Sequence, residues 1–472
     1  MPGPTKLHKR LWLVVVSVLL VLGLMLPTSA LAEAGTWVGS IQVMNIGGAT
    51  ANVTVTFYNQ DGTQATTASN NVAPGSSWNI YTPSVSGLTP GFVGSVIVSS
   101  NQPVVAIGSE NVTYPDGSIG VSQYSGMGAS EIGTQFYLPN VNKQFGASQW
   151  STRITIQNAT SAANRVTVYY YDADGNEVTA ARNTVDLSGY GSVTFRQAEN
   201  TGLRPGWLGS AVVSGTGNLA VVVDVISADG RVETYNGVKE GATTLYIPTL
   251  LKGFGSNKWN SSFQVFNPSA TETATLTINY YTAGNPTPTK TDSGITLGPR
   301  RSSNYYLPSL AGIPDNWLGS VTIQSDKPVV AVASQSSGAP GTNKASIYNA
   351  FSAGSTTAYL PTILRNFGSS NYVTSFQIMN VSSSPASVTV EYFAPGNPTP
   401  VKTVRYNGSE QPKIQPFTSV NRYQPDVDPE LGTGWQGSVK VTSDVPVVVV
   451  GSQNALARTG DTVGQYGGFA VP

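Results

Sequence analysis

The chain has 472 residues, of which 25 are Lys or Arg and 25 are Asp or Glu, and charged residues make up only 11% of it. It contains no Cys and its only His is His8, so disulfides, a lipid-modified cysteine and thiolate sites for zinc or copper are excluded. No cluster of Lys and Arg is present to neutralise phosphates, so the composition does not fit a nucleic-acid-binding protein.

The first 32 residues have the organisation of a secretory signal peptide. Basic residues precede an apolar run from Leu11 to Leu26, and Ala30-Leu31-Ala32 supplies the small residues of a cleavage site. The 16-residue run is shorter than the roughly 20 residues that span a bilayer, so cleavage before Glu33 is favoured over a retained anchor. Cleavage leaves 22 basic against 25 acidic residues, a net charge of about −3, and removes His8. We therefore expect a secreted or cell-surface protein with no membrane association after cleavage and no Ser-His-Asp or Cys-His catalysis.

The rest of the sequence repeats itself four times. Segments that begin with an aromatic residue and end in Asn recur as WVGSIQVMN, WSTRITIQN, WNSSFQVFN and YVTSFQIMN, ending at Asn45, Asn158, Asn267 and Asn380. Their spacings of 113, 109 and 113 residues predict four units of roughly 110 residues, a typical size for one domain. We expect a signal peptide at 1–32 and β repeat units at 33–139, 140–248, 249–361 and 362–472.

Each unit consists of short segments with strand character, in the same order along the chain. An alternating segment such as RVTVYYYDADG follows the Asn, and a strand of the pattern aromatic-x-Gly-Ser comes later, as in NWLGSVTIQ from Asn316. An apolar run such as Val329–Ala333 follows, and connectors such as LYIPTLLKGFG join the units. No stretch has helical spacing.

These segments predict an all-β protein of four tandem Ig-like β-sandwich units. The alternative is an eight-bladed β-propeller, because aromatic-initiated strands start every 52 to 63 residues and divide each unit into halves of about 55 residues. The sandwich is favoured because whole units match one another more closely than halves do.

The combination of YNG or YNA at Tyr235 and Tyr348, YLP or YIP, SFQVFN, GWLGS and PVVAV resembles tandem-repeat secreted proteins of Chloroflexota-like bacteria. The resemblance covers nearly all of the chain after the leader. It implies an extracellular β-rich protein of the Ig-like repeat class, and it transfers no activity and no functional residue.

Two acidic groups are candidate calcium sites. Asp172 and Asp174, in DADGNE, imitate the start of a calcium loop, and Asp426, Asp428 and Glu430 lie together in PDVDPELG. Against the first group, the equivalent turns TAGNP and APGNP keep only the Gly, so the shared requirement is a tight turn. The simpler interpretation of the second group is a solvent-exposed loop that binds no metal. No other cofactor is expected.

Trp78 is the candidate ligand residue, because an exposed Trp can stack on a sugar. Aligned with Thr194, Asn304 and Asn421, it is expected to point outward from its strand. Six other Trp residues occupy repeat-equivalent positions where Phe92 or Tyr372 also occurs, which favours a packing role. The repeated Asn residues are expected to bond their own backbone at the strand ends.

We therefore expect a non-enzymatic structural protein of the cell surface or matrix, forming a stalk, sheath or filament. One alternative is a carbohydrate-binding or adhesion module, and another is a carboxylate-dependent glycosidase. Unit four stops soon after Tyr466, so one end of the chain should lack the Tyr-x-Pro strand that each internal junction has. Such an edge favours head-to-tail self-association, and other surface proteins or glycans are further candidate partners.

Overall fold

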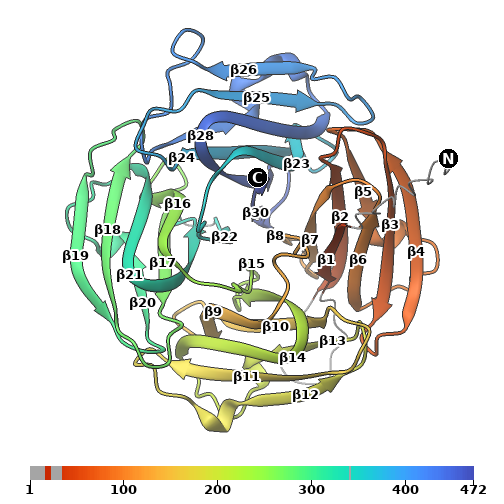
Figure 1. Ribbon diagram of the computed structural model, residues 1–472, viewed down its shortest axis with the longest axis vertical. Coiled ribbons are helices and arrows are strands. Elements are labelled where there is room, and N and C mark those ends of the chain that lie inside the picture. The colour runs from red at the N-terminus through yellow and green to blue at the C-terminus, as the bar shows by residue number, and fades with distance from the viewer. Residues whose placement is uncertain (1–15, 23–34, 340–341, 472) are drawn as a thin grey trace, which may run out of the picture.

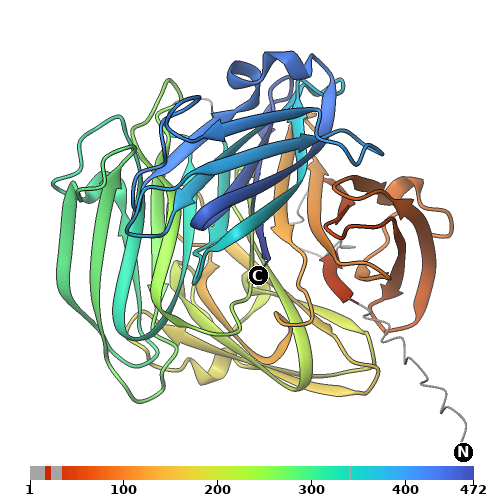
Figure 2. The ribbon, with the colours of Figure 1, turned by 45° about the horizontal axis from the view of Figure 1, so that its top comes forward.

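The computed structural model describes residues 16–22, 35–339 and 342–471, and these form an all-β protein. Among the described residues the helices are one α-helix, α1 (Gln424–Val427), and five 3₁₀ turns, and none is long and apolar enough to cross a membrane. Figure 1 shows the strands grouped into four units around a central axis. In the tilted view of Figure 2, unit 1, in red to orange, lies beside unit 4, in blue, although these are the first and last units along the chain.

Unit 2 shows how one repeat folds. Its two four-stranded sheets have the orders β12-β11-β14-β9 and β13-β10-β14-β15 and share one long strand, whose first half lies in one sheet and whose second half lies in the other. The alternating segment of β11 places Val166, Val168 and Tyr170 in the core with no exposed surface. Its strands are β9 (Gly133–Lys143), β10 (Ser151–Asn158), β11 (Asn164–Asp172), β12 (Asn183–Leu187), β13 (Ser192–Arg196), β14 (Trp207–Ile226) and β15 (Val232–Asn236).

The other units repeat this two-layer arrangement, which confirms the sandwich prediction. In unit 1 the long strand is divided into β6 and β7. Unit 1 contains β1 (Val16–Leu22), β2 (Thr36–Asn45), β3 (Ala51–Asn59), β4 (Gln64–Val72), β5 (Ser77–Tyr81), β6 (Gly94–Ser100), β7 (Val104–Thr113) and β8 (Ile119–Ser125). Unit 3 contains β16 (Ala242–Lys252), β17 (Asn260–Phe266), β18 (Ala274–Thr282), β19 (Lys290–Leu297), β20 (Ser302–Tyr306), β21 (Trp317–Ser336) and β22 (Ala345–Asn349). Unit 4 contains β23 (Ser355–Arg365), β24 (Tyr372–Asn380), β25 (Val388–Phe393), β26 (Lys402–Tyr406), β27 (Ser419–Tyr423), β28 (Trp435–Ala455), β29 (Gly460–Asp461), β30 (Val463–Gly467) and β31 (Phe469–Val471).

The propeller alternative is wrong because a half-unit does not form a sheet of its own. In unit 2, one sheet combines β10 and β13, which precede Trp207, with β15 and part of β14, which follow. Each sheet therefore needs both halves of the repeat, and a blade of about 55 residues would leave its strands without their hydrogen-bonding neighbours.

The Tyr-x-Pro segments open the units that follow them. β9, β16 and β23 pair with the long strands β14, β21 and β28, so the expected boundaries after residues 139, 248 and 361 fall inside strands. The same position in unit 1 is taken by β1, which pairs antiparallel with β6 from Val16↔Ser100 to Leu22↔Gly94. β1 belongs to the predicted signal peptide, and the rest of that peptide lies outside the described residues.

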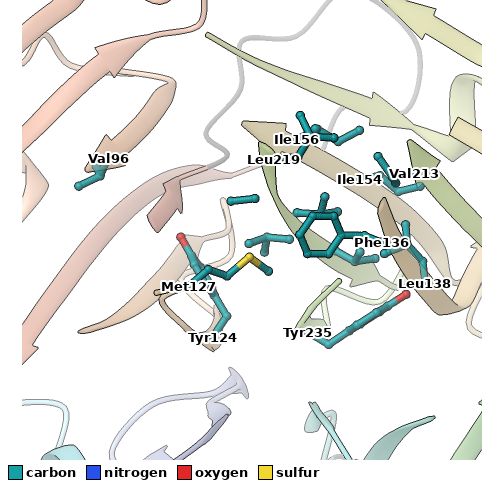
Figure 3. Close-up of a cluster of buried hydrophobic side chains, with 14 of the residues drawn as sticks. Val96, Tyr124, Met127, Phe136, Leu138, Ile154, Ile156, Val213, Leu219 and Tyr235 are labelled. Atoms are coloured by element: carbon teal, nitrogen blue, oxygen red, sulfur yellow. The ribbon is translucent and has the colours of Figure 1, made fainter. Parts of the chain in front are cut away.

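The cores of neighbouring units are continuous. One cluster of buried apolar side chains spans units 1 and 2, and Figure 3 shows part of it, where Tyr124 and Met127 come from unit 1 and Phe136 and Tyr235 come from unit 2. This cluster excludes water between the two units. The units therefore pack as one body rather than as separate beads.

The aromatic-x-Gly-Ser motif belongs to the contacts between units. Its Gly lets the aromatic ring fold back, since a Cβ on Gly209 would lie 2.5 Å from the Trp207 ring and 2.2 Å from a carbonyl oxygen of β11. Its Ser reaches the next unit: Ser320 Oγ donates to the carbonyl of Phe417 at 2.6 Å. Ser95 and Ser438 make the same bond, to Tyr190 and Gly75, and all three acceptors have positive φ.

The ring closes between unit 4 and unit 1. Ser438 bonds Gly75, the Gly396 N–H donates to Ser76 Oγ at 2.7 Å, and Ser77 Oγ donates to the Pro361 carbonyl at 2.7 Å. These bonds are made across a junction that no peptide link spans, and they repeat the pattern of the internal junctions. The recurring motif therefore encodes the ring as well as the sandwich.

Candidate ligand site on the central axis

Four short strands line the centre of the ring, β8, β15, β22 and β30, one from each unit (Figure 1). Each carries a fully buried tyrosine at the same repeat position: Tyr124, Tyr235, Tyr348 and Tyr466. The hydroxyls of the last three donate to backbone carbonyls of the opening strand of their own unit at 2.6, 2.8 and 3.1 Å. Burial raises the pKa of all four hydroxyls, so these tyrosines are uncharged anchors that fix the inner strands.

The residue after each tyrosine ties neighbouring units together. Asn236 Nδ2 donates to the Ser125 carbonyl at 2.6 Å, and Asn349 Nδ2 donates to the Asn236 carbonyl at 2.7 Å. Ser125 Oγ donates to the Gly467 carbonyl at 2.8 Å, which links unit 1 to unit 4. These bonds form a polar belt around the axis.

The belt forms part of a cavity of about 580 Å³, which we call the axial pocket. Residues from all four units line it, among them the polar Gln123, Thr234 and Gln465 and the apolar Phe351 and Phe469. Gln123 is 1% exposed and its Oε1 has no hydrogen-bond partner among the described residues. Because this atom is also shielded from solvent, a ligand in the pocket would contact the other amides, hydroxyls and aromatic rings of the lining.

The other end of the inner strands is closed by the carboxylate of Asp461. Its two oxygens accept the N–H groups of Val232 and Ala345, at 2.8 and 2.9 Å, from units 2 and 3. The short strand that carries it, β29, runs parallel to β8 of unit 1. Burial raises the pKa of Asp461 well above its usual range, although the backbone donors lower it. Asp461 thus joins four units at one point.

Further buried charges lie at the junctions of unit 2 with units 1 and 3. Arg153, where the other repeats have Ser, lies 3.3 Å from Glu110 and 3.0 Å from Asp224, and its guanidinium stacks 4.4 Å from the Trp37 ring. Glu233, 4% exposed, accepts a hydrogen bond from the Ser334 hydroxyl at 2.6 Å, and burial raises its pKa from 4.5 to about 7. Arg153 therefore neutralises the carboxylates of Glu110 and Asp224. The charged form of Glu233, in contrast, is unfavourable in its buried position.

The first predicted calcium group forms a turn and a contact between units. The Asp172 carboxylate accepts the N–H groups of Asp174 and Asn176 at 3.0 and 2.9 Å, and Asp174 pairs with Arg301 of unit 3. Both carboxylates are therefore engaged by protein donors. Within the described ranges, no three His, Cys, Asp or Glu side chains are placed to hold a metal ion.

The acidic residues of the second predicted calcium group lie in different environments. Asp428 has no exposed surface and pairs with Arg422 and with Lys402, whose Nζ lies 2.6 Å away and also pairs with Glu430. Asp426 is in α1 and pairs with none of them in the described contacts. The interpretation as a solvated loop is also wrong for Asp428, which is the centre of a buried ion network. Arg422, Lys402 and Glu430 border an open cavity of about 1080 Å³ between units 3 and 4, and their charges are satisfied within the network.

The prediction that Trp78 points outward is wrong, because the alignment behind it is shifted by one residue. β5 pairs with β2 so that Trp78 lies opposite Val43 and Ile80 opposite Ile41, both core residues, and Trp78 is half-buried against that core. The residue equivalent to Asn304 is Asn79, because each faces a Gln on the neighbouring strand. A slip of one residue in an alignment of strands reverses the face, which removes Trp78 as a stacking platform.

The repeated asparagines bond the backbone of their own turn, as predicted, and each also bonds a second, distant carbonyl. Asn158 Oδ1 accepts the N–H of Thr160 at 3.1 Å, and Nδ2 donates to the Ala162 carbonyl at 2.7 Å, within the turn. Nδ2 also donates at 2.8 Å to the Ser188 carbonyl, which lies 30 residues away. The same pair of contacts occurs at Asn45, Asn267 and Asn380. Each Asn therefore joins a turn to a distant strand end.

The sequence alone does not predict the axial pocket. The recurring Tyr points to it only once four distant segments of the chain meet at one axis. The signal that could have found the pocket is the contrast between an invariant Tyr and the residues after it, which are Ser, Asn, Asn and Gly.

A closed ring of four β-sandwich units with a cavity on its axis is the class of protein that the structure defines. Residues 130–416 match the model described as "Family of unknown function (DUF5719)", and because this match covers more than half of the chain, the chain belongs to that family. No curated protein matches the chain.

Some solved structures show limited similarity. "Crystal Structure of Thermotoga maritima 1070" is 20% identical and covers 24% of this chain and 94% of its own, with a TM-score of 0.21. "Anabaena sensory rhodopsin transducer" is 22% identical and covers 19% of this chain and 94% of its own, with a TM-score of 0.16. At these TM-scores the similarity supports no conclusion about activity.

Proposed function

We propose that the protein is a secreted, non-enzymatic binding ring that acts at the cell surface and holds a neutral saccharide in its axial pocket. The observation that carries this proposal is a cavity that all four units build and whose lining combines amides, hydroxyls and aromatic rings. Secretion rests on the signal-peptide pattern of the first 32 residues.

The chemistry of the pocket favours a sugar. Its inner wall offers amides and hydroxyls, which bond sugar hydroxyls, and the Phe351 and Phe469 rings line its wall, where they can pack on the apolar face of a sugar ring. Lys239 and Glu240 also line it with opposite charges, 3.7 Å apart, so the pocket presents no cationic cluster for a phosphate.

The same lining argues against a glycosidase. Such enzymes need two carboxylates free to act as acid and as base or nucleophile. Glu131 and Glu240 are the carboxylates of the lining, and each is engaged: Glu131 Oε2 accepts the Gly128 N–H at 2.7 Å, and Glu240 faces Lys239. We therefore infer binding without turnover.

The test is a glycan array probed with the secreted protein, followed by calorimetry on any sugar that binds. Phe351→Ala should weaken binding about tenfold, since ring stacking contributes on the order of 1 kcal/mol. Ser352→Trp, at an exposed lining position, should block the pocket without disturbing the core. Tyr306→Ala, which removes an aromatic ring that is 48% exposed and outside the pocket, is the matched control and should bind normally. Absence of binding, or binding that both pocket variants leave unchanged, would contradict the proposal.

A further inference from the structure

The opening strand of each unit completes both a sheet and a core. In unit 3, β16 adds to the edge of β21, and its Leu245, Ile247 and Leu250 are buried in the core. β9 and β23 do the same in units 2 and 4, again with apolar residues at the inward positions. Each unit therefore depends on a strand that precedes its own aromatic-initiated segment.

In unit 1 this strand comes from the leader. β1 pairs with β6 at the position that β9 takes in unit 2, since Val96↔Leu20 corresponds to Ala211↔Leu138 and Val98↔Val18 corresponds to Val213↔Phe136. Cleavage before Glu33 would remove β1. The backbone of β6 would then be an open edge beside Val96 and Val98, which have no exposed surface in the complete sheet.

We propose that β6 of the processed protein is a strand-acceptor site, which binds an extended segment of a partner polypeptide in place of β1. This inference rests on the secretion in the proposed function and is independent of the axial pocket. In a second molecule of this protein, residues 35–339 and 342–471 are already folded into that molecule's own units, so they do not provide the strand. The occupant is therefore a separate segment with apolar residues at alternate positions.

The three filled junctions define what that segment looks like. β9, β16 and β23 share the central pattern Tyr-x-Pro, and their polar residues Gln135, Thr244 and Thr357 face Ser214, Gln324 and Thr442 on the long strands. The acceptor residue equivalent to these three is Ser99. Main-chain hydrogen bonds along β6 give the affinity, and the inward apolar side chains give the specificity.

The experiment uses protein secreted by an expression host, with the N-terminus determined by sequencing, and the labelled peptide ATTLYIPTLLK, which is the sequence of β16. We expect an N-terminus at Glu33 and saturable binding of the peptide in fluorescence anisotropy. A peptide carrying Leu245→Asp and Ile247→Asp should bind at least tenfold more weakly. Full-length chain made in the cytosol, which retains β1, should also bind weakly.

Cross-linking fixes the position of the peptide. Because the chain has no Cys, Ser99→Cys provides a single thiol, which should form a disulfide with a Thr244→Cys peptide. Ser69→Cys, on β4 at the opposite edge of the same sheet, is the control and should not react above background. A secreted chain that keeps residues 16–22, an absence of peptide binding, or equal reaction at Ser99 and Ser69 would overturn the proposal. Saccharide binding by the same preparation, and its loss in Phe351→Ala, tests the axial pocket separately.

Discussion

Replacing Glu233 by Gln should remove a pH dependence from the stability of the ring. Burial raises the pKa of Glu233 from 4.5 to about 7, against the opposing effects of Ser334 and Arg231. The folded protein therefore holds this proton more tightly than the unfolded chain does. The stabilisation from this proton is fully present below about pH 4.5 and is lost as the pH rises to about 7. Above that pH, Glu233 causes no further change in the free energy of unfolding. A shift of about 2.5 units corresponds to ~3 kcal/mol.

The Gln variant keeps the shape and an acceptor for Ser334 but carries no charge at any pH. At pH 8 we expect it to be more stable than the wild type by up to about 3 kcal/mol, and at pH 4 to be nearly equal to it. Urea unfolding followed by Trp fluorescence at several pH values measures the difference. Glu240→Gln, at an exposed position seven residues away, is the control and should leave the profile unchanged. Wild-type and Glu233→Gln curves that run parallel from pH 4 to pH 8 would refute the reasoning.

Three further predictions concern packing and charge. Ser320→Ala should destabilise the protein by about 1 kcal/mol, because the Phe417 carbonyl loses its donor. Ser210→Ala removes a buried hydroxyl that has no partner among the described residues, so it should cost almost nothing in the same urea titration. Asp428→Ala should cost about 3 to 5 kcal/mol by leaving the buried Arg422 guanidinium without its carboxylate, while EDTA should leave the melting temperature of the wild type unchanged. Trp317→Ala, at a side chain that is 2% exposed, should cost about 3 to 5 kcal/mol, and an unchanged melting curve would show that the ring is not part of the core.

The strands and the sandwich could be predicted because their signals are local. Alternation in a segment such as Arg165–Asp172 fixes which side chains face inward, and the spacing of Asn45, Asn158, Asn267 and Asn380 fixes the size of the unit. The ring could not be predicted in this way. In three of the four aromatic-x-Gly-Ser motifs the Ser bonds a carbonyl in a different unit, and that partner has no fixed sequence: it is Tyr190, Phe417 or Gly75.

The candidate sites failed for a related reason. The calcium predictions rest on acidic residues that are close in sequence, but cations distant along the chain pair with these carboxylates, as Arg301 does with Asp174 and Lys402 with Asp428. Trp78 failed through an alignment shifted by one residue, which only the pairing of β5 with β2 corrects. Charge balance and strand register are therefore tertiary properties that a local pattern does not contain.

The junction between unit 4 and unit 1 determines whether the repeats form a closed ring or a filament. A head-to-tail contact between identical units either propagates into a filament or closes into a ring, depending on the rotation between units. Here the contact from unit 4 returns to unit 1 of the same chain, where Gly396 meets Ser76 and Ser77 meets Pro361. Because both surfaces belong to one chain, their effective concentration is far above that of a second molecule in dilute solution. A filament built through these surfaces would have to open the junction first, and assembly into a sheath would therefore need a surface outside this junction.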